Sequence, residues 1–176
     1  MKLDWMRGCA TALVTPFKND GSIDEPALRR LVDLQIRDSI DMLVPCGTTG
    51  EGATLEVDEA ERVLSIVVDQ SKGRVPVIFG GGSNSTAKAV QGAERAKRLG
   101  AAGVLSVGPY YNKPTQRGFI EHFKAVAEAG LPVVVYNVPG RTGSNIEAST
   151  MLKLAEFPNI VAVKEFRQLQ HRRCFD

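Results

Sequence analysis

A lysine, Lys164, ends a short apolar run near the carboxyl end of the 176-residue sequence. The run, residues 161–163, follows Pro158 and Asn159, a pattern typical of the tip of a buried parallel strand. Burial disfavours the charged form of a lysine, and a neutral amine is a nucleophile that can attack a carbonyl carbon. The alternative is a strand-end lysine whose ammonium group reaches water, and this segment alone favours that alternative.

Three further polar segments follow apolar runs in the same way. They are Gly47-Thr48-Thr49-Gly50-Glu51, Pro109-Tyr110-Tyr111-Asn112 and Tyr136-Asn137-Val138-Pro139-Gly140-Arg141-Thr142-Gly143. Hydroxyl groups can donate and accept hydrogen bonds at once, and a guanidinium group can bind a carboxylate through two bonds. Taken singly, Tyr136 is typical of a half-buried strand aromatic, Arg141 of a solvated loop charge, and the two threonines of a turn. Only the joint pattern favours a functional site.

Short apolar strands and amphipathic helices alternate along the sequence, and this alternation predicts a parallel sheet. The predicted strands span residues 9–14, 42–46, 76–79, 103–107 and 132–136, and a sixth strand ends at Lys164. The predicted helices follow Asp24 as N-cap, begin near Asp58, span residues 85–100, follow Thr115 as N-cap and span residues 148–157. The residues that could do chemistry therefore follow strands two, four, five and six.

Six strand-helix units with functional residues at the carboxyl ends of the strands predict an α/β fold, a (β/α)8 barrel truncated after about six units. A doubly wound open sheet is the main alternative. That alternative requires a phosphate-binding loop such as G-x-G-x-x-G directly after a strand, and the sequence contains neither this pattern nor the Walker pattern. The segment Gly80-Gly81-Gly82 is therefore interpreted as a tight turn.

The composition is that of an ordinary globular domain, with 43% hydrophobic and 24% charged residues. A formal net charge of +2 gives no electrostatic reason to expect binding to nucleic acid or to an anionic membrane surface. Asp4 lies where a signal peptide needs its apolar region, and no later apolar run approaches the length of a membrane span. These features predict a cytoplasmic protein that acts on small molecules.

Cysteine and histidine usage gives no metal-binding pattern. Cys9, Cys46 and Cys174 have no paired ligand spacing, so all three are predicted to be reduced, and the first two lie in strand-like runs and are predicted to be core residues. His122 and His171 have no second plausible ligand nearby in the sequence. No zinc site is predicted.

Together, in this order and each after a strand, the four segments closely resemble those of the dihydrodipicolinate synthase family. The resemblance extends from Arg7 to Glu165. The wider group of pyruvate-dependent Schiff-base aldolases also includes N-acetylneuraminate lyase, which shares the lysine and the strand-five tyrosine. The pair Thr48-Thr49 and Arg141 favour the synthase over these relatives.

The resemblance implies that Lys164 forms an imine with the ketone of pyruvate. The imine becomes an enamine that attacks aspartate semialdehyde and gives 4-hydroxy-tetrahydrodipicolinate, a step of lysine and diaminopimelate biosynthesis. No cofactor is implied, because the lysine itself serves as the electron sink. Tyr136 is implied as the proton carrier, linked through the hydroxyl group of Thr48 to Tyr111.

The same resemblance implies two binding residues and an assembly. Thr49 would bind the pyruvate carboxylate, and Arg141 would bind the carboxylate of the second substrate. In the family Tyr111 reaches across a subunit interface, which implies a homo-oligomer built as a dimer of dimers. Another pyruvate-dependent aldolase acting on a sugar acid, which would not require Arg141, and an inactive truncated remnant are the alternatives.

The sequence departs from the family after residue 165. A complete barrel takes about 250 residues, so residues 1–165 are interpreted as a partial barrel that lacks strands seven and eight and exposes sheet edges at strands one and six. Residues 166–176 lack the expected glycine turn. We hypothesise that this tail is a frameshift product, because its codons can encode Ser-Gly-Asn when read one nucleotide later. Sequencing the coding DNA tests this hypothesis, which an intact frame without a hidden family continuation would contradict.

Overall fold

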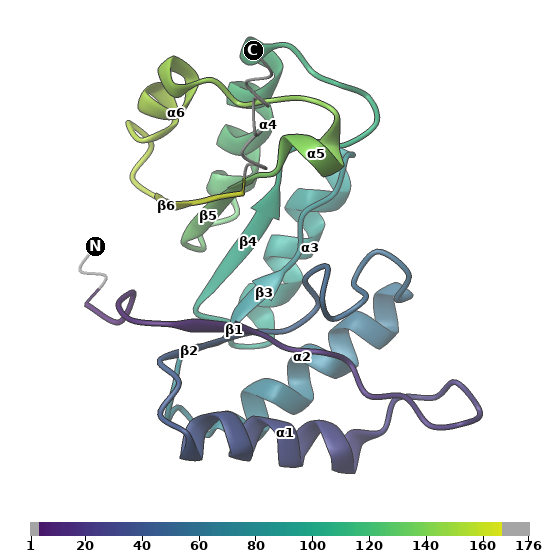
Figure 1. Ribbon diagram of the computed structural model, residues 1–176. Helices are drawn as coiled ribbons and strands as arrows, with labels where there is room; N and C mark the ends of the chain where they lie inside the picture. Colours follow the sequence, from purple (N-terminus) through teal and green to yellow (C-terminus); the bar gives the residue numbers. More distant parts are fainter. Residues whose placement is uncertain (1–3, 167–176) are drawn as a thin grey trace, which may run out of the picture.

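The computed structural model describes residues 4–166, which contain six strands and six helices (Figure 1). One helix separates each pair of successive strands up to β5, and two helices separate β5 from β6. The strands are β1 (Ala10–Ala12), β2 (Met42–Val44), β3 (Ile78–Gly80), β4 (Gly103–Val107), β5 (Val133–Asn137) and β6 (Ile160–Glu165). The helices are α1 (Glu25–Arg37), α2 (Val57–Ser71), α3 (Thr86–Arg98), α4 (Gln116–Glu128), α5 (Pro139–Thr142) and α6 (Ala148–Leu154). The predicted tail, apart from Phe166, lies outside the described residues.

Each strand lies parallel to the next strand of the sequence. β1 pairs with β2, and β3, β4, β5 and β6 pair in that order. A parallel bridge between Leu43 and Val77, and a hydrogen bond of 2.9 Å from the Gly80 amide to the Pro45 carbonyl, join β2 to β3. A doubly wound sheet reverses its strand order, so this unbroken order excludes the open-sheet alternative and agrees with the winding of a barrel.

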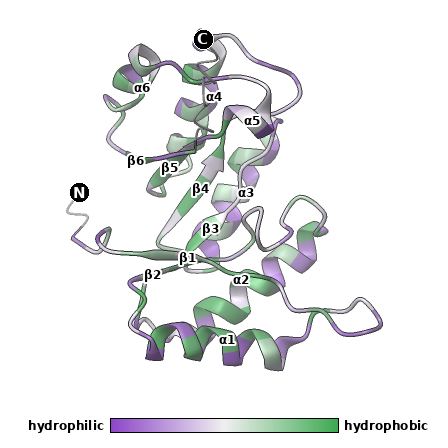
Figure 2. Ribbon diagram, viewed as in Figure 1, coloured by the Kyte–Doolittle hydropathy of each residue, from purple (hydrophilic) through white to green (hydrophobic). Residues whose placement is uncertain are grey.

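Two hydrophobic clusters occupy opposite faces of the sheet. Val104 belongs to the cluster between the strands and the helices, and the adjacent Leu105 belongs to the cluster on the other face. Successive strand residues point to opposite faces, which separates the two clusters. The helices follow the outer side of the curved sheet (Figure 1), and hydrophobic residues concentrate on the strands and on one side of each long helix (Figure 2). This arrangement leaves the inner face to side chains of the strands, as in a barrel.

The helix ends follow local hydrogen bonding. The side chain of Asp24 accepts from the Ala27 amide at 2.9 Å, and the side chain of Thr115 accepts from the Gly118 amide at 3.2 Å, so both predicted N-caps are confirmed. Helix α2 ends at Ser71 with the next residue in the left-handed conformation. None of the helices in residues 4–166 is long and apolar enough to span a membrane.

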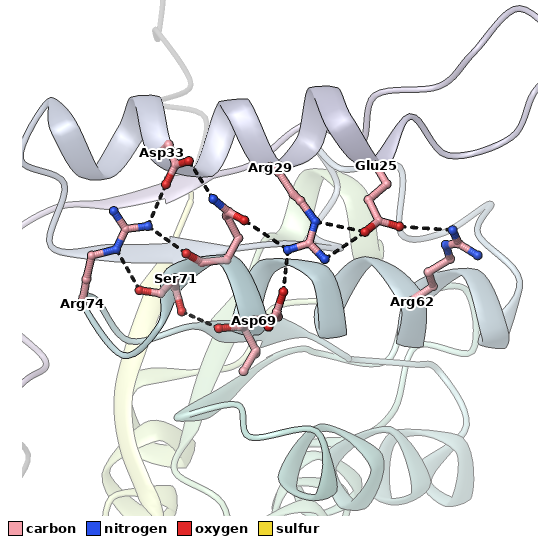
Figure 3. A network of polar contacts seen from close by, with 9 residues as sticks. Glu25, Arg29, Asp33, Arg62, Asp69, Ser71 and Arg74 are labelled. Carbon is pink, nitrogen blue, oxygen red and sulfur yellow. Dashed lines mark hydrogen bonds and ion pairs between the residues drawn. The ribbon is translucent and has the colours of Figure 1, made fainter.

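A polar network joins α1 to α2 on the outer surface (Figure 3). Its ion pairs are Arg29–Glu25 at 2.8 Å, Arg29–Asp69 at 2.5 Å, Arg74–Asp33 at 2.7 Å and Arg62–Glu25 at 3.2 Å. The hydrogen bond from Arg29 lowers the pKa of Glu25, and the one from Arg74 lowers the pKa of Asp33. Beneath the network, Leu28 and Val32 of α1 are fully buried.

Three sequence-based predictions are wrong. β6 is not the buried strand that its apolar run indicates: among the described strands it pairs with β5 alone, and Lys164 at its end is exposed, which agrees with the open edge predicted at strand six. Cys9 is exposed because it precedes β1 at the other edge of the sheet, whereas Cys46 is buried as predicted. Residues 139–142 form the short helix α5 in the segment predicted as a loop, because the carbonyl of Val138 accepts from the Arg141 and Thr142 amides.

Candidate active site

The six predicted site residues lie at or beyond the carboxyl ends of strands. Thr48 and Thr49 follow β2, Tyr111 follows β4, Tyr136 and Lys164 lie near the ends of β5 and β6, and Arg141 lies in α5. The carboxyl ends of parallel strands meet along one rim of a sheet. The fold therefore carries all six residues on the rim where barrels place their active sites.

Lys164 and Tyr136 are in contact. They are register partners on β6 and β5, and the Lys164 Nζ atom lies 4.5 Å from the centroid of the Tyr136 ring. An ammonium group over an aromatic face is attracted by the negative charge density of the ring. Tyr136 is half-buried and packs against the inner hydrophobic cluster, so its ring gives the amine a fixed neighbour.

The segment after β2 is a tight loop anchored to the segment that follows β1. The hydroxyl group of Thr15, which follows β1, donates to the Gly50 carbonyl at 2.7 Å inside the protein. A Cβ atom on Gly52 would lie 2.0 Å from the Cys46 carbonyl oxygen, so this position requires glycine. The loop leaves the side chains of Thr48 and Thr49 exposed at its tip.

Tyr111 is held in a strained conformation and points away from the chain. Its φ is 72°, and the Asn112 amide donates to the Tyr110 carbonyl at 2.9 Å, which closes a γ-turn around it. Its own amide donates to the Thr142 carbonyl at 3.3 Å, which ties the loop after β4 to α5. The side chain is 88% exposed, and strain of this kind is typical of functional positions.

Arg141 lies in the single turn α5. The turn ends at Gly143, whose φ of 72° allows the chain to reverse, and the Thr142 hydroxyl donates to the Ser144 carbonyl at 2.8 Å. Within residues 4–166, the guanidinium group of Arg141 makes no hydrogen bond or ion pair and is exposed. Its five donors are therefore available to an anionic ligand.

Of the six predicted site residues, the structure brings Lys164 and Tyr136 into contact. In the described part of the chain, no hydrogen bond links the Tyr136 hydroxyl to Thr48 or Tyr111. Two polar residues that the sequence reasoning passed over support the site: Thr15 anchors the loop after β2, and Asn137 bonds to the residue after Lys164. The register could have indicated Asn137, because a strand pairing that places Tyr136 opposite Lys164 also places Asn137 opposite Glu165.

The buried titratable residues lie outside this rim constellation. His122 of α4 has Nδ1 2.9 Å from the Thr86 hydroxyl, and burial lowers its pKa to about 4. Burial raises the pKa of the Cys46 thiol to about 12. Neither group is poised as a base or nucleophile at neutral pH. Residues 4–166 contain no group of three or more His, Cys, Asp or Glu side chains that could hold a metal ion.

Parallel strands in sequential order, helices on the outer face and polar residues along the carboxyl rim define the class of protein: the described residues fold as five strand-helix units and the sixth strand of a (β/α)8 barrel. A family model described as the dihydrodipicolinate synthetase family matches residues 5–172. The chain belongs to this family.

Several similar proteins are named as synthases of this family. The 4-hydroxy-tetrahydrodipicolinate synthase of Geotalea uraniireducens (strain Rf4) is 58% identical over 160 residues, which are 90% of this chain and 55% of that protein. The crystal structure of dihydrodipicolinate synthase from Aquifex aeolicus matches with a TM-score of 0.89 at 47% identity, over 92% of this chain and 56% of that one. The enzyme from Acinetobacter baumannii, complexed with pyruvate, matches with a TM-score of 0.89 at 45% identity, over 91% and 55%. The chain thus spans about half the length of the relatives it matches.

Proposed function

We propose that this chain carries the Schiff-base site of a lyase that condenses pyruvate with aspartate semialdehyde to give 4-hydroxy-tetrahydrodipicolinate, in lysine and diaminopimelate biosynthesis. The observation that carries the proposal is the contact between Lys164 and Tyr136 at the ends of neighbouring parallel strands. Membership of the family supports the identity of the two substrates.

The proposed chemistry begins with attack of the neutral Lys164 amine on the ketone carbon of pyruvate. A C–N bond forms, the ketone oxygen leaves as water, and an imine results. Loss of a proton from the methyl carbon gives an enamine, and this carbon forms a C–C bond to the aldehyde carbon of aspartate semialdehyde. The amino group of the second substrate then attacks the imine carbon, which closes the ring and releases Lys164.

Tyr136 is proposed as the proton carrier for imine formation, with Thr48 and Tyr111 continuing the relay. The contact of the Tyr136 ring with the Lys164 Nζ atom supports this role, because it places the tyrosine beside the amine that reacts. Thr49 is proposed to bind the pyruvate carboxylate. Arg141 is proposed to bind the carboxylate of the second substrate, since its guanidinium group is exposed on the same rim.

The assembled protein is proposed to act in the cytoplasm as a homo-oligomer, a dimer of dimers, in which Tyr111 enters the site of a second subunit. The exposure of Tyr111 and its strained, hydrogen-bonded loop support this assembly, because an aromatic side chain held outward is suited to contact a partner. Analytical ultracentrifugation tests it. A Tyr111→Asp variant is expected to shift the chain toward monomer, and an unchanged mass distribution would contradict the role of Tyr111.

The experiment that tests the proposed chemistry is reductive trapping. The 176-residue chain is incubated with pyruvate and borohydride, digested and mapped by mass spectrometry. The expected result is a reduced pyruvate adduct on Lys164 and none on Lys153, an exposed lysine of α6 that serves as the internal control. Lys164→Met is expected to abolish the adduct.

Turnover with different second substrates distinguishes the proposed synthase from an aldolase that acts on a sugar acid. After trapping is established, turnover with aspartate semialdehyde is compared with turnover with sugar acids on the same preparation. Faster turnover of a sugar acid would contradict the proposed second substrate. Absence of a Lys164 adduct in a folded sample would instead support the inactive remnant.

A further inference from the structure

Asn137 makes an unusually complete set of hydrogen bonds around the end of β6. Its side chain is 1% exposed, and its Nδ2 group lies 3.1 Å from Oε1 and 3.0 Å from Oε2 of Glu165. The same group lies 2.9 Å from Asn145 Oδ1, and the Asn137 Oδ1 atom accepts from the Ile146 amide at 3.1 Å. The main-chain carbonyl of Asn137 also accepts from the Phe166 amide at 3.0 Å. One side chain therefore connects β5, β6 and the segment before α6.

The pairs Tyr136–Lys164 and Asn137–Glu165 are adjacent steps of the same ladder and lie on opposite faces of the sheet. Tyr136 packs on the inner cluster, where Lys164 contacts its ring. Asn137 bonds to Ile146, a member of the outer cluster. A shift of β6 relative to β5 would break the outer pair and displace the inner pair together.

Within residues 4–166, burial constrains the end of β6 weakly. Val163 is 48% exposed, Lys164 and Glu165 are exposed, and the ladder between β5 and β6 already contains an irregularity at Val133 and Val134. Directional hydrogen bonds to a charged carboxylate are stronger than those between neutral groups. They can fix the register of a strand end that apolar packing does not hold.

We propose that Asn137 is a positioning residue for the amine of Lys164, acting through the bonds of its side chain to Glu165. The inference rests on the proposed function in assigning the reaction to Lys164. Its structural content, that the Asn137–Glu165 bonds hold Lys164 over the Tyr136 ring, can be tested without substrate.

The test compares four variants of the 176-residue chain. Asn137→Asp removes the donor and places two carboxylates against each other. Glu165→Gln keeps an acceptor for the Asn137 amide, and the double variant N137D/E165Q restores the bond with donor and acceptor exchanged. Asn159→Asp makes the same chemical change just before the start of β6, where Asn159 bonds to the Ala127 carbonyl at 3.0 Å.

The first readout is the NMR shift of the Lys164 methylene protons next to Nζ, which the Tyr136 ring current moves upfield. We expect N137D to lose this shift, N137D/E165Q to regain it, and E165Q and N159D to retain it. The second readout is the rate of reductive pyruvate trapping, which we expect to fall roughly tenfold in N137D, because small displacements of a reacting group slow reactions steeply. A merely structural role would lower stability without this pattern of rescue.

The outcomes separate the two proposals. If N137D keeps the ring-current shift, or if the folded double variant does not regain it, the positioning role is overturned. If N137D does not fold, Glu165→Ala, a change at an exposed side chain, replaces it, and retention of the shift there overturns the role equally. If the unaltered chain forms no adduct, the proposed function fails, while the NMR readout still decides the role of Asn137.

Discussion

The two ends of the described sheet are held together in different ways. At the α1–α2 end, fully buried side chains such as Leu28 and Val32 lie beneath a surface network of ion pairs (Figure 3). At the β5–β6 end, Lys164 is exposed, and hydrogen bonds from the Asn137 side chain to Glu165 add to the backbone ladder between the two strands.

The difference shows where stability and chemistry reside in this fold. Apolar burial in the outer layer contributes most of the stability, because its contribution scales with the area removed from water. The polar rim must stay open to ligands, so it depends on hydrogen bonds and tight turns that fix geometry without covering the functional groups.

Removing a buried side chain at the α1–α2 end has the largest expected effect on stability. Leu28→Ala leaves a cavity between α1 and the core, and we expect the free energy of unfolding to fall by about 4 kcal/mol. Urea denaturation measures this change. Leu34→Ala on the exposed part of the same helix is the control and should cost far less. If Leu28→Ala also slowed pyruvate trapping per folded molecule by an equivalent free energy, the two ends of the sheet would not act independently.

Acid should destabilise the protein first through His122. Its pKa is lowered to about 4 by burial, so the unfolded state, with a pKa near 6.5, binds the proton first as the pH falls. We expect stability to decline between about pH 6.5 and pH 4, by about 3 kcal/mol in total. Denaturation at a series of pH values measures this change.

The ion pairs between α1 and α2 should lose their contribution to stability at lower pH values than His122 does. Glu25 and Asp33 have lowered pKa values, so their contribution is present above about pH 4.5 and is lost as the pH falls through their folded values. His122→Gln should remove the loss between pH 6.5 and pH 4 and leave the lower one, whereas His171→Gln is the control. A decline confined to pH values below 4.5 in the unaltered chain would contradict the assignment to His122.

Tyr136→Phe separates the packing of the ring against Lys164 from the proposed proton transfer by the hydroxyl group. The variant keeps the ring beneath Lys164 and removes only the hydroxyl group, so stability should be nearly unchanged. Loss of a proton carrier should slow pyruvate trapping by about 100-fold. Tyr110→Phe, in the loop after β4, is the matched control. An unchanged trapping rate in Y136F would exclude the proposed role of the hydroxyl.

Removing an ion pair of the α1–α2 network has the smallest expected effect. Arg74→Ala breaks the pair with Asp33, and we expect Tm to fall by at most about 4 °C, because exposed pairs are weak. The difference should shrink in about 1 M salt, which screens exposed charges. Arg37→Ala, whose pair joins it only to the adjacent Asp38, is the control. A larger shift that persists in salt would mean that this pair contributes more than an exposed ion pair does.

Much of the fold could be predicted because its signals are local. Asp24 and Thr115 cap helices through bonds to amides three residues away, and residues 103–107 form β4 with the predicted bounds. The order of the sheet followed from the alternation of strands and helices, since each parallel strand must return through a helix before pairing with its neighbour. The rim location of Thr48, Tyr111, Tyr136 and Lys164 follows from that order.

The contacts that could not be predicted join residues far apart in the sequence. Arg29 meets Asp69 across 40 positions, and Asn137 meets Glu165 across 28, and no periodicity of the chain encodes either contact. The apolar run before Lys164 by itself indicated a buried strand, but burial of a strand depends on neighbours on both sides. β6 has one described neighbour, which leaves the open edge that the partial-barrel interpretation predicted.

By itself, then, the sequence determined which residues form strands, where helices begin and which side chains reach the rim, because these depend on bonds within a few residues. The tertiary structure alone decided that Tyr111 points outward at a φ of 72°, that the Lys164 amine lies over the Tyr136 ring and that Asn137 restrains the strand beside it. These features arise from packing between separate strands and loops, whose relative placement is set only when the chain folds.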